Sequence, residues 1–229
     1  GFDLFGIKEP FSSLTFYHSN IYLNIVIILL IITGGIGFLV WGDIGTHKYR
    51  IRRFSLQSKV VLMTSAVLIV LPALYFFFYE YNRETIHDRT IHSLFQSVTT
   101  RTAGFNTTDL AAMDESGTAI MIILMLIGGS PGSTAGGMKT TTFAVLFLSA
   151  ITVLSRRNDV QCFKRRISDE AVRSAGAVLF MYLVLFFTSG IIISRVENLP
   201  LLTCLFETSS AIGTVGLSLG ITSGLSAVS

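Results

Sequence analysis

The sequence predicts an all-α membrane protein with tandem helix–pore loop–helix repeats around a central ion pore and a broken third inner helix. Three observations predict this class. Of the 229 residues, 51% are hydrophobic and only 14% are charged, with a mean hydropathy of +0.65, whereas soluble domains carry about 25% charged residues. Several apolar runs approach the ~20 residues that a membrane-spanning helix needs. A short Thr-x-Gly segment also recurs along the chain.

The recurring segment is SVTTRTAGFNTTD, residues 97–109. Its core TAGF (102–105) returns as TVGL (214–217), and a Gly-Phe trace of it opens the chain. The glycines of these copies are Gly1, Gly104 and Gly216, which lie 103 and 112 residues apart. A unit of roughly 105–110 residues therefore repeats, and such a fixed period indicates a repeat architecture. Because the chain begins inside a unit, we expect it to be a fragment.

The first two apolar runs, residues 20–41 and 60–78, are each long enough to be a membrane-spanning helix. The first run contains Gly34, Gly35 and Gly37, which allow a close helix approach or a bend. In the second, Pro72 predicts a kink that is tolerable inside a helix bundle.

The next apolar run, residues 90–100, is too short to span and leads directly into the polar core at 102–105. Non-helical backbone at membrane depth survives only where protein or a water-filled cavity satisfies its polar groups. A short helix and a polar strand between two full spans therefore predict a re-entrant pore loop. The half-length run 200–210, which leads into 212–216 after a fourth predicted span at 175–194, has the same pattern.

The third span, residues 119–154, is interrupted. Its apolar halves are separated by GGSPGSTAGGMKTTT, residues 128–142. Five glycines and a proline do not form a stable helix, and a helix broken at membrane depth indicates a transport site or a moving gate. The residues assigned to this gate are Gly128, Gly129, Ser130, Pro131, Gly132, Ser133, Thr134, Ala135, Gly136, Gly137 and Lys139.

Charge distribution predicts the orientation. The loops 43–59 and 155–173 hold eleven of the seventeen Lys and Arg residues, so the positive-inside rule predicts that both are cytoplasmic and that the Thr-x-Gly loops face outside. The pI near 9.0 is read as charge beside membrane spans, not as a nucleic-acid interface. Repeats of one orientation, related by an axis along the membrane normal, would ring a pore.

The chemistry of these loops predicts a cation path. Rings of backbone carbonyls replace the hydration shell of K⁺ in potassium filters, and glycine adopts the positive φ that turns carbonyls to one side. Glu207 is expected to be a structural carboxylate, and Arg101 to point behind the filter toward carbonyl groups there. The residues assigned to the filter are Gly1, Thr100, Arg101, Thr102, Ala103, Gly104, Ile212, Gly213, Thr214, Val215 and Gly216.

Segments 97–109, 128–142 and 205–220 resemble the third filter, the third inner-helix loop and the fourth filter of the Trk/Ktr/HKT superfamily of potassium transporters, most closely the Ktr membrane subunit. The resemblance implies four tandem helix–pore–helix units and K⁺ transport across the cell membrane. It also implies a homodimer bound to a cytosolic, nucleotide-binding regulatory ring of RCK type, which carries the only nucleotide. The domains would then be the end of the second repeat (1–46), the third repeat (47–155) and an incomplete fourth repeat (156–229).

Alternatives remain for the Gly-rich loop. A flexible kink without gating is the main one. A phosphate-binding P-loop needs a preceding strand, and a protease nucleophile at Ser130 or Ser133 needs a histidine on a neighbouring span; neither is predicted. Lys139 is left open as an electrostatic barrier, a latch, or a side chain that reaches the cytosolic edge.

The competing functional classes would leave different patterns in the sequence. A membrane enzyme needs ionisable residues that converge within the spans, and there are almost none besides Lys139, so we expect no enzymatic activity. The alternative function is an H⁺- or Na⁺-coupled secondary transporter of another solute, which would usually show inverted repeats. The sequence leaves open whether Na⁺ activates transport and how strictly K⁺ is preferred.

His92 and its charged neighbours at 83–89 are expected to form a solvated outer rim.

Overall fold

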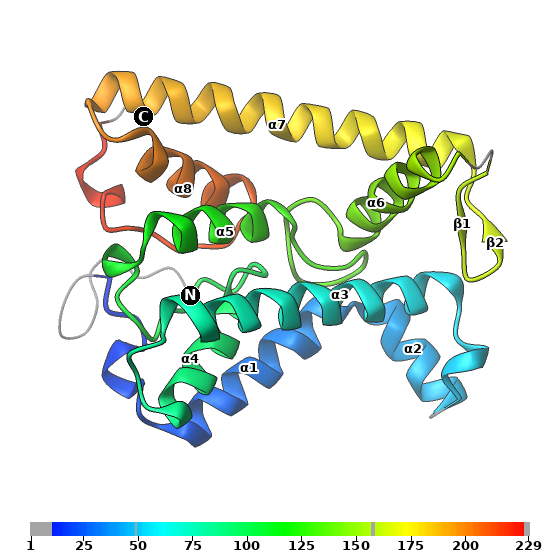
Figure 1. The fold of residues 1–229 in the computed structure, drawn as a ribbon, viewed down its shortest axis with the longest axis horizontal. Coiled ribbons are helices and arrows are strands. Elements are labelled where there is room, and N and C mark those ends of the chain that lie inside the picture. The colour runs from blue at the N-terminus through cyan, green and yellow to red at the C-terminus, as the bar shows by residue number, and fades with distance from the viewer. Residues whose placement is uncertain (1–10, 49, 157–158, 227–229) are drawn as a thin grey trace.

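The structure, a computed structural model, describes residues 11–48, 50–156 and 159–226. Long helices lie along two opposite sides of it, with shorter helices between them (Figure 1). The helices are α1 (Ile21–Ile36), α2 (Phe38–His47), α3 (Leu56–Tyr75), α4 (Ile86–Thr99), α5 (Glu115–Leu126), α6 (Thr140–Leu154), α7 (Asp169–Glu197) and α8 (Leu201–Ile212), and the strands are β1 (Gln161–Cys162) and β2 (Arg165–Arg166). Short 3₁₀ turns lie at Thr15–Tyr17, Ile51–Arg53, Leu110–Ala112 and Thr222–Gly224.

Among the described residues, two helices are long and apolar enough to cross a membrane, Leu56–Glu80 and Asp169–Glu197, or three if the bent pair α1 and α2 is one span. In their most apolar windows only 28% and 11% of the residues are buried. Exposed apolar surface on this scale is expected of helices that face lipid. The chain is therefore a multi-pass, mostly helical membrane protein, as its sequence predicts.

The first apolar run is not one straight helix. It is α1 and α2, which meet at Gly37 at an angle of 93°, and the bend is visible along the lower edge of Figure 1. Gly37 has φ 93°, a conformation that L side chains rarely adopt. Trp41 on α2 donates an indole hydrogen bond to the carbonyl of Thr33 (3.0 Å) across the bend. The glycine cluster in this run thus produces a bend, one of the two outcomes expected of it.

The second span is continuous through Pro72. Proline lacks an N–H, so the carbonyl four residues earlier, that of Leu68, loses its helical partner. The hydroxyl of Ser97 on α4 lies 3.5 Å from that carbonyl and donates to the adjacent one of Ile69 at 2.6 Å. The proline therefore creates a docking point for α4, and the local irregularity is a π-helical turn, Phe76–Glu80, at the end of the helix.

Helices α4 and α8 are too short to cross a bilayer. They contain 14 and 12 residues, against the ~20 that a span needs. α4 packs against α1 and α3, and α8 against α5 and α7. Each short helix thus lies inside the bundle beside a spanning helix, in the way the sequence predicts for pore helices.

The interrupted third span consists of α5 and α6, with residues 127–139 non-helical between them. This is consistent with the predicted break, although Thr140, Thr141 and Thr142 already belong to α6. The non-helical segment, here called the gate loop (residues 127–139), lies between the two long sides of the molecule in Figure 1. Its Ile127 and Met138 belong to the main hydrophobic core, with Met121, Phe206 and Leu217.

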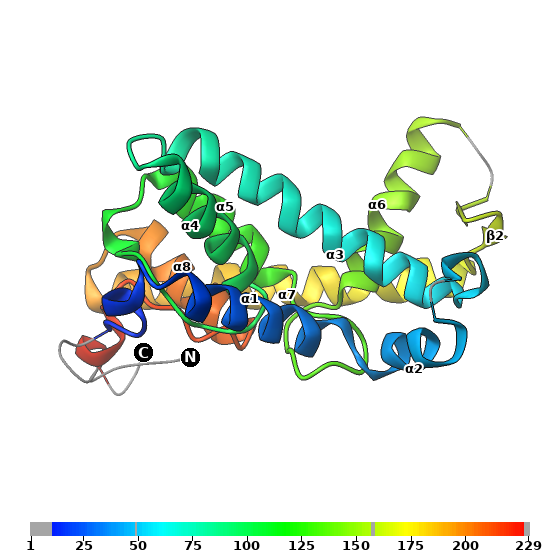
Figure 2. The same cartoon turned by 90° about the horizontal axis from the view of Figure 1, so that it is seen from below.

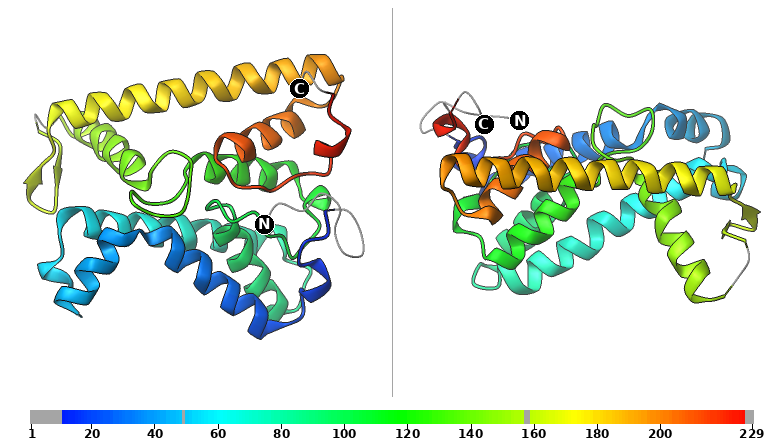
Figure 3. Two further views of the ribbon diagram at one scale, coloured as in Figure 1. Left: turned by 180° about the vertical axis from the view of Figure 1, so that it is seen from behind. Right: turned by 90° about the horizontal axis from the view of Figure 1, so that it is seen from above.

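The two basic loops lie at one end of the molecule. The connections α2–α3 and α6–α7 are on the same side in Figure 1, and the views of Figures 2 and 3 agree. The second connection contains the antiparallel hairpin of β1 and β2, which the sequence analysis treated only as a loop. Its turn residues Phe163 and Lys164 have φ 48° and 64°, as a two-residue type I′ hairpin turn requires.

Candidate ion pathway and gate loop

Two loops carry the predicted filter residues other than Gly1 and Ile212, and Ile212 is the last residue of α8. Filter loop A (residues 100–105) follows α4, and filter loop B (residues 213–217) follows α8. In loop A the amides of Ala103 and Gly104 both donate to the carbonyl of Thr99, at 3.2 and 3.4 Å, and the Thr99 hydroxyl donates to the Phe105 carbonyl. The end of the short helix therefore holds the loop that follows it.

Filter loop B is held in a similar way. Ser210 near the end of α8 accepts from the Val215 amide through its carbonyl (2.8 Å) and from the Gly216 amide through its hydroxyl (3.1 Å). In both loops, amides of the filter residues are satisfied by the preceding helix. Their carbonyl oxygens are then the backbone groups left to face another partner.

The backbone conformations of the two loops match. Thr102 and Gly104 have φ 61° and 75°, and the equivalent Thr214 and Gly216 have φ 54° and 90°. Two left-handed residues separated by one residue give both loops a similar backbone path at this point. A threonine in this conformation is uncommon. Its presence at the same place in both loops supports a shared requirement on the backbone.

The two filter loops touch through their backbones. A Cβ atom on Gly104 would lie 2.2 Å from the carbonyl oxygen of Val215 and 3.1 Å from the Cα of Gly216. Real Cβ contacts are essentially never that short, so only glycine fits at position 104. The two loops are therefore in direct backbone contact at Gly104. Gly1, the third predicted filter glycine, lies outside the described residues.

Arg101 lies behind filter loop A. It is 4% exposed, and its guanidinium Nη2 donates to the hydroxyl of Ser65 on α3 at 3.0 Å. The Arg101 side chain points away from the loop, as the sequence analysis expects. Its hydrogen-bond partner, however, is a hydroxyl group and not the expected carbonyl groups. The Nε atom has no hydrogen-bond partner among the described residues. Arg101 thus anchors the loop to a spanning helix.

Glu207 on α8 is 8% exposed and has a full set of partners. Its carboxylate accepts from the Ser218 hydroxyl (2.7 Å), the Leu219 amide (2.8 Å) and the Thr222 hydroxyl (2.8 Å). These bonds hold the segment that follows filter loop B. This geometry fits the predicted structural carboxylate. A cavity of about 400 Å³ lies between Glu207 and filter loop B.

The gate loop is closed at its base by its own backbone. The Gly128 amide donates to the Met138 carbonyl (2.8 Å), and the Thr140 amide donates to the Gly129 carbonyl (3.1 Å). The hydroxyls of Thr140 and Ser130 lie 3.2 Å apart, and both residues are fully buried. The two broken halves of the span are therefore joined at a tight neck, and the residues between 130 and 137 form the loop itself.

The gate loop contacts filter loop B directly. A Cβ atom on Gly136 would lie 1.9 Å from the Thr214 hydroxyl oxygen, and one on Gly137 would lie 3.5 Å from the Gly213 carbonyl oxygen. Glycine at 136 is therefore required for this contact. The gate loop therefore lies directly against filter loop B.

The other side of the gate loop contacts the bend between α1 and α2. The Phe38 amide donates to the Gly132 carbonyl (2.9 Å), and the Ser130 amide donates to the Gly35 carbonyl (3.1 Å). A Cβ atom on Gly37 would lie 2.6 Å from the Pro131 carbonyl oxygen. Sequence reasoning missed this contact. The sequence feature that could have indicated the contact is the glycine cluster at 34–37, but this cluster lies almost a hundred residues from the gate loop.

Lys139 ends the gate loop as the residue before α6. Its ammonium Nζ donates to the Ala135 carbonyl at 2.7 Å, and the side chain is half-buried. Of the roles left open by the sequence, this geometry matches a latch that closes the loop on itself.

His92 on α4 differs from expectation. The sequence analysis placed it in a solvated rim, but it is 5% exposed, and its Nδ1 lies 2.7 Å from Glu84 Oε2. Tyr81 packs edge-on against its ring. The helical turn Ile91–Phe95 faces the bundle, so a histidine on that face is buried with it.

The sequence of this chain is similar to those of known cation transport proteins. A family model described as "TrkH: Cation transport protein" matches residues 1–229. The potassium/sodium uptake protein NtpJ of Enterococcus hirae is 36% identical over all of this chain and 51% of its own length. The Ktr system potassium uptake protein B of Bacillus subtilis is 38% identical over 87% of this chain and 46% of its own length. The chain spans about half the length of these curated relatives.

A solved structure supports the fold. The crystal structure of the potassium transporter TrkH from Vibrio parahaemolyticus matches 91% of this chain and 48% of its own chain, with a TM-score of 0.71 at 17% identity. The arrangement of spanning helices, short helices and loops described above is therefore shared with a solved membrane transporter.

Proposed function

Because the chain belongs to the TrkH family of cation transport proteins, we propose that it forms part of a potassium uptake transporter. The observation that carries the proposal is the pair of matched filter loops that meet backbone to backbone at Gly104. Relatives named for potassium uptake, two of them above 35% identity, support K⁺ as the transported ion. The ion would cross the cell membrane along the axis on which the loops converge.

In this proposal the filter works through backbone carbonyls of the residues in loops A and B, with Gly1 contributing a third strand. Carbonyl oxygens replace the hydration shell of K⁺. The short helices α4 and α8 satisfy the loop amides, so the carbonyls remain available to the ion. The side chain of Arg101 stays outside this path and fixes loop A through Ser65.

The gate loop would close the pathway beside the filter. Its contact with Thr214 through Gly136 supports this role, as does its packing on the bend at Gly37. A loop that is held at its neck but carries five glycines and is partly or fully exposed at its tip, residues 131–134, is suited to local movement. A kink without gating remains the competing role, and the experiments below distinguish the two.

The proposal extends to the whole protein. The full-length protein would be a homodimer of helix–pore–helix repeats, in which this chain supplies residues 1–46, 47–155 and 156–229 of the second, third and fourth repeats. A cytosolic nucleotide-binding ring would regulate it from the end that holds the basic loops. Relatives named as parts of Ktr and Trk systems support a multi-component assembly. One relative is named for both potassium and sodium, which supports testing Na⁺ as an activator.

The filter assignment is tested by Gly104→Ser in the full-length protein, with K⁺ and Na⁺ uptake measured in cells that lack their own K⁺ uptake. The added side chain would meet the Val215 carbonyl, so we expect the preference for K⁺ over Na⁺ to fall by about tenfold, or 1.4 kcal/mol. Gly176→Ala on α7, where a Cβ has open space, is the matched control. Unchanged selectivity in a properly inserted Gly104→Ser protein would contradict the assignment.

A further inference from the structure

A cavity of about 740 Å³ lies at the beginning of α3, where two segments distant in sequence meet. One wall is the turn before α3 and its first two helical turns, and the other is the tip of the β1–β2 hairpin. This basic–apolar pocket is lined by Ile51, Arg52, Lys59, Leu62, Met63, Phe163 and Lys164.

The rim of the pocket is basic and not neutralised. The side chains of Arg52 and Lys164 make no ion pair or hydrogen bond with a residue that the structure describes, while Lys59 donates only to the Arg52 carbonyl (2.8 Å). The pocket's lining contains no carboxylate, and carboxylates next to the two connections are engaged elsewhere, since Asp43 accepts from Ser55 and Ser58 and Asp159 pairs with Arg166. The pocket therefore presents positive charge without a counter-ion.

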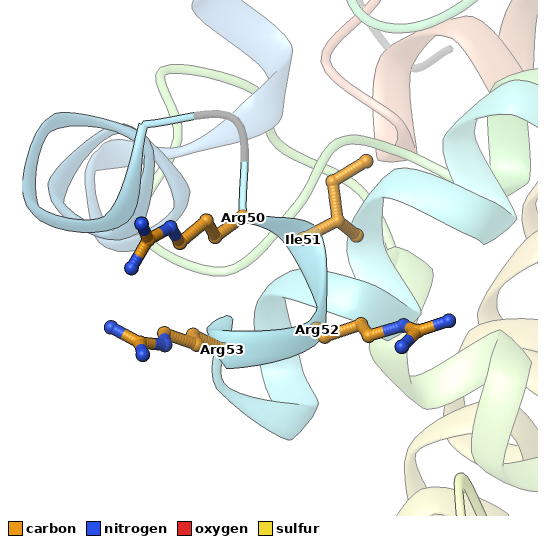
Figure 4. Close-up of a pocket in the computed structure, with 4 residues that line it drawn as sticks. All are labelled: Arg50, Ile51, Arg52 and Arg53. Atoms are coloured by element: carbon orange, nitrogen blue, oxygen red, sulfur yellow. The ribbon is translucent and has the colours of Figure 1, made fainter.

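The turn before α3 spreads its charge over two directions. Figure 4 shows the side chains of Arg50 and Arg53 pointing to one side of the turn and that of Arg52 to the other. A second cavity of about 420 Å³ is lined by these three arginines and Ile51. Positive potential thus surrounds the beginning of α3.

The floor of the pocket is apolar and continues along α3. Met63 and Phe163 are 61% and 51% exposed. From Met63 onward, the large apolar residues of α3 that are exposed are spaced three and four apart, so they lie on one face of the helix. They are Met63, Val67, Val70, Leu71 and Leu74. Met63 is seven residues into α3, about 10 Å from its start at 1.5 Å per residue, so the basic rim lies where the apolar span meets water.

We propose that the basic–apolar pocket binds an anionic phospholipid. Arg52, Lys59 and Lys164 hold the headgroup phosphate, and one acyl chain lies along the exposed face of α3 below Met63. A phosphate paired with several cations makes charge-assisted hydrogen bonds, and clustered basic residues beside a membrane span attract anionic lipids. An acidic protein surface would use the rim but not the apolar face that continues into the membrane.

This lipid would join two repeats. The turn 51–53 connects α2 to α3, and the hairpin connects α6 to α7. α2 carries the bend that contacts the gate loop, and α6 begins at the loop's neck. A bound headgroup between these two connections would hold together the far ends of α2 and α6, the two helices that begin at the gate loop's contacts.

The proposal is tested by native mass spectrometry of the full-length protein, purified in neutral detergent and supplied with equal amounts of phosphatidylglycerol and phosphatidylcholine. Wild-type protein should retain phosphatidylglycerol preferentially. The triple variant Arg52→Gln, Lys59→Gln, Lys164→Gln should retain about tenfold less. The matched control Arg156→Gln, Arg165→Gln, Arg173→Gln removes the same charge from exposed residues of the same basic loop region outside the pocket and should retain it within about twofold.

Further arms separate the lipid from other occupants. Met63→Ser with Phe163→Ser keeps every charge and should still reduce retention about threefold, because the acyl chain loses its apolar floor. Excess inorganic phosphate should not displace the lipid. The proposal would be overturned if the pocket and control triple variants lost phosphatidylglycerol equally, or if inorganic phosphate displaced the lipid. So would a pocket variant that retains phosphatidylglycerol but loses binding of a cytosolic protein partner, since the surface would then be a protein interface.

Discussion

Arg101 places a guanidinium group in the buried wall behind filter loop A, and its hydrogen bond goes to one hydroxyl, that of Ser65. Its side chain is 4% exposed, so water does not readily replace a lost partner. The cost of leaving a buried donor unsatisfied is larger than the net contribution of an average hydrogen bond. Ser65 is therefore a supporting residue for the filter, even though it lies 36 residues earlier on α3.

We predict that Ser65→Ala lowers the free energy of unfolding by about 1–3 kcal/mol and weakens the preference for K⁺, because Arg101 no longer fixes loop A. Thermal inactivation of the purified protein and competitive K⁺/Na⁺ uptake measure the two effects. Ser174→Ala, at an exposed serine on α7, is the control. If Ser65→Ala matches this control in both assays, Arg101 does not act through Ser65.

Glu207 illustrates how a carboxylate beside a cation path can be structural. Its oxygens are occupied by Ser218, Leu219 and Thr222. We predict that Glu207→Gln keeps K⁺ uptake within about threefold, because the amide oxygen still accepts and the two hydroxyls can rotate. Glu207→Ala should lower uptake at least tenfold, since one amide and two hydroxyls, all partly buried, lose the acceptor that holds the segment after filter loop B.

The reverse pattern would change the role of Glu207. If Glu207→Gln lowers uptake as much as Glu207→Ala, then the negative charge itself acts on the ion. Uptake rates at matched protein levels in the membrane are sufficient to distinguish the two roles.

At the scale of elements, the bend between α1 and α2 and the gate loop form one packed unit. The Gly35 and Gly132 carbonyls accept from amides of the opposite segment, so a movement of either segment breaks bonds to the other. α2 leads from this unit to the basic end of the molecule (Figure 1). The bend therefore connects the gate loop to the side where a regulator is proposed to bind.

We predict that Gly37→Ala raises basal K⁺ flux several-fold, because its Cβ would meet the Pro131 carbonyl at 2.6 Å and φ 93° disfavours any side chain. Gly35→Ala is a closely matched control: it lies two residues earlier, inside α1, with nothing within 4 Å of its Cβ. Flux into proteoliposomes compares them. Equal flux in both variants would show that the bend does not hold the gate loop in place.

At the scale of the whole molecule, the class of fold and the positions of the two loops that follow the short helices were predictable because their signals are local. The Thr-x-Gly core begins two or three residues after the end of a short helix in both copies, and glycine permits the positive φ found at Gly104 and Gly216. The interruption at 128–142 was predictable from glycine content alone. Each of these signals is contained within about fifteen residues of sequence.

Other features depend on contacts between distant segments and were missed or misjudged. The gate loop meets Gly35 and Gly37 across almost a hundred residues, and no periodicity reports such a pair. His92 was expected in a solvated rim because charged neighbours surround it in sequence, but the face of α4 decides its burial. The partner of Arg101 on α3 was not predicted either, since a guanidinium group finds whichever acceptor the packing supplies.

The central claim, that the gate loop lies against the filter and closes it, is tested most directly by a reversible cross-link. Cysteines at Gly136 and Thr214 would join the two segments: a Cβ on Gly136 would lie 3.0 Å from the Thr214 Cβ, so a small outward shift brings the pair to the ~3.5–4.5 Å that a disulfide needs. K⁺ flux of the oxidised double variant in proteoliposomes should fall at least tenfold and return with reductant, while each single variant is unaffected by either treatment. A fully cross-linked protein that conducts as fast as its reduced form would contradict the account.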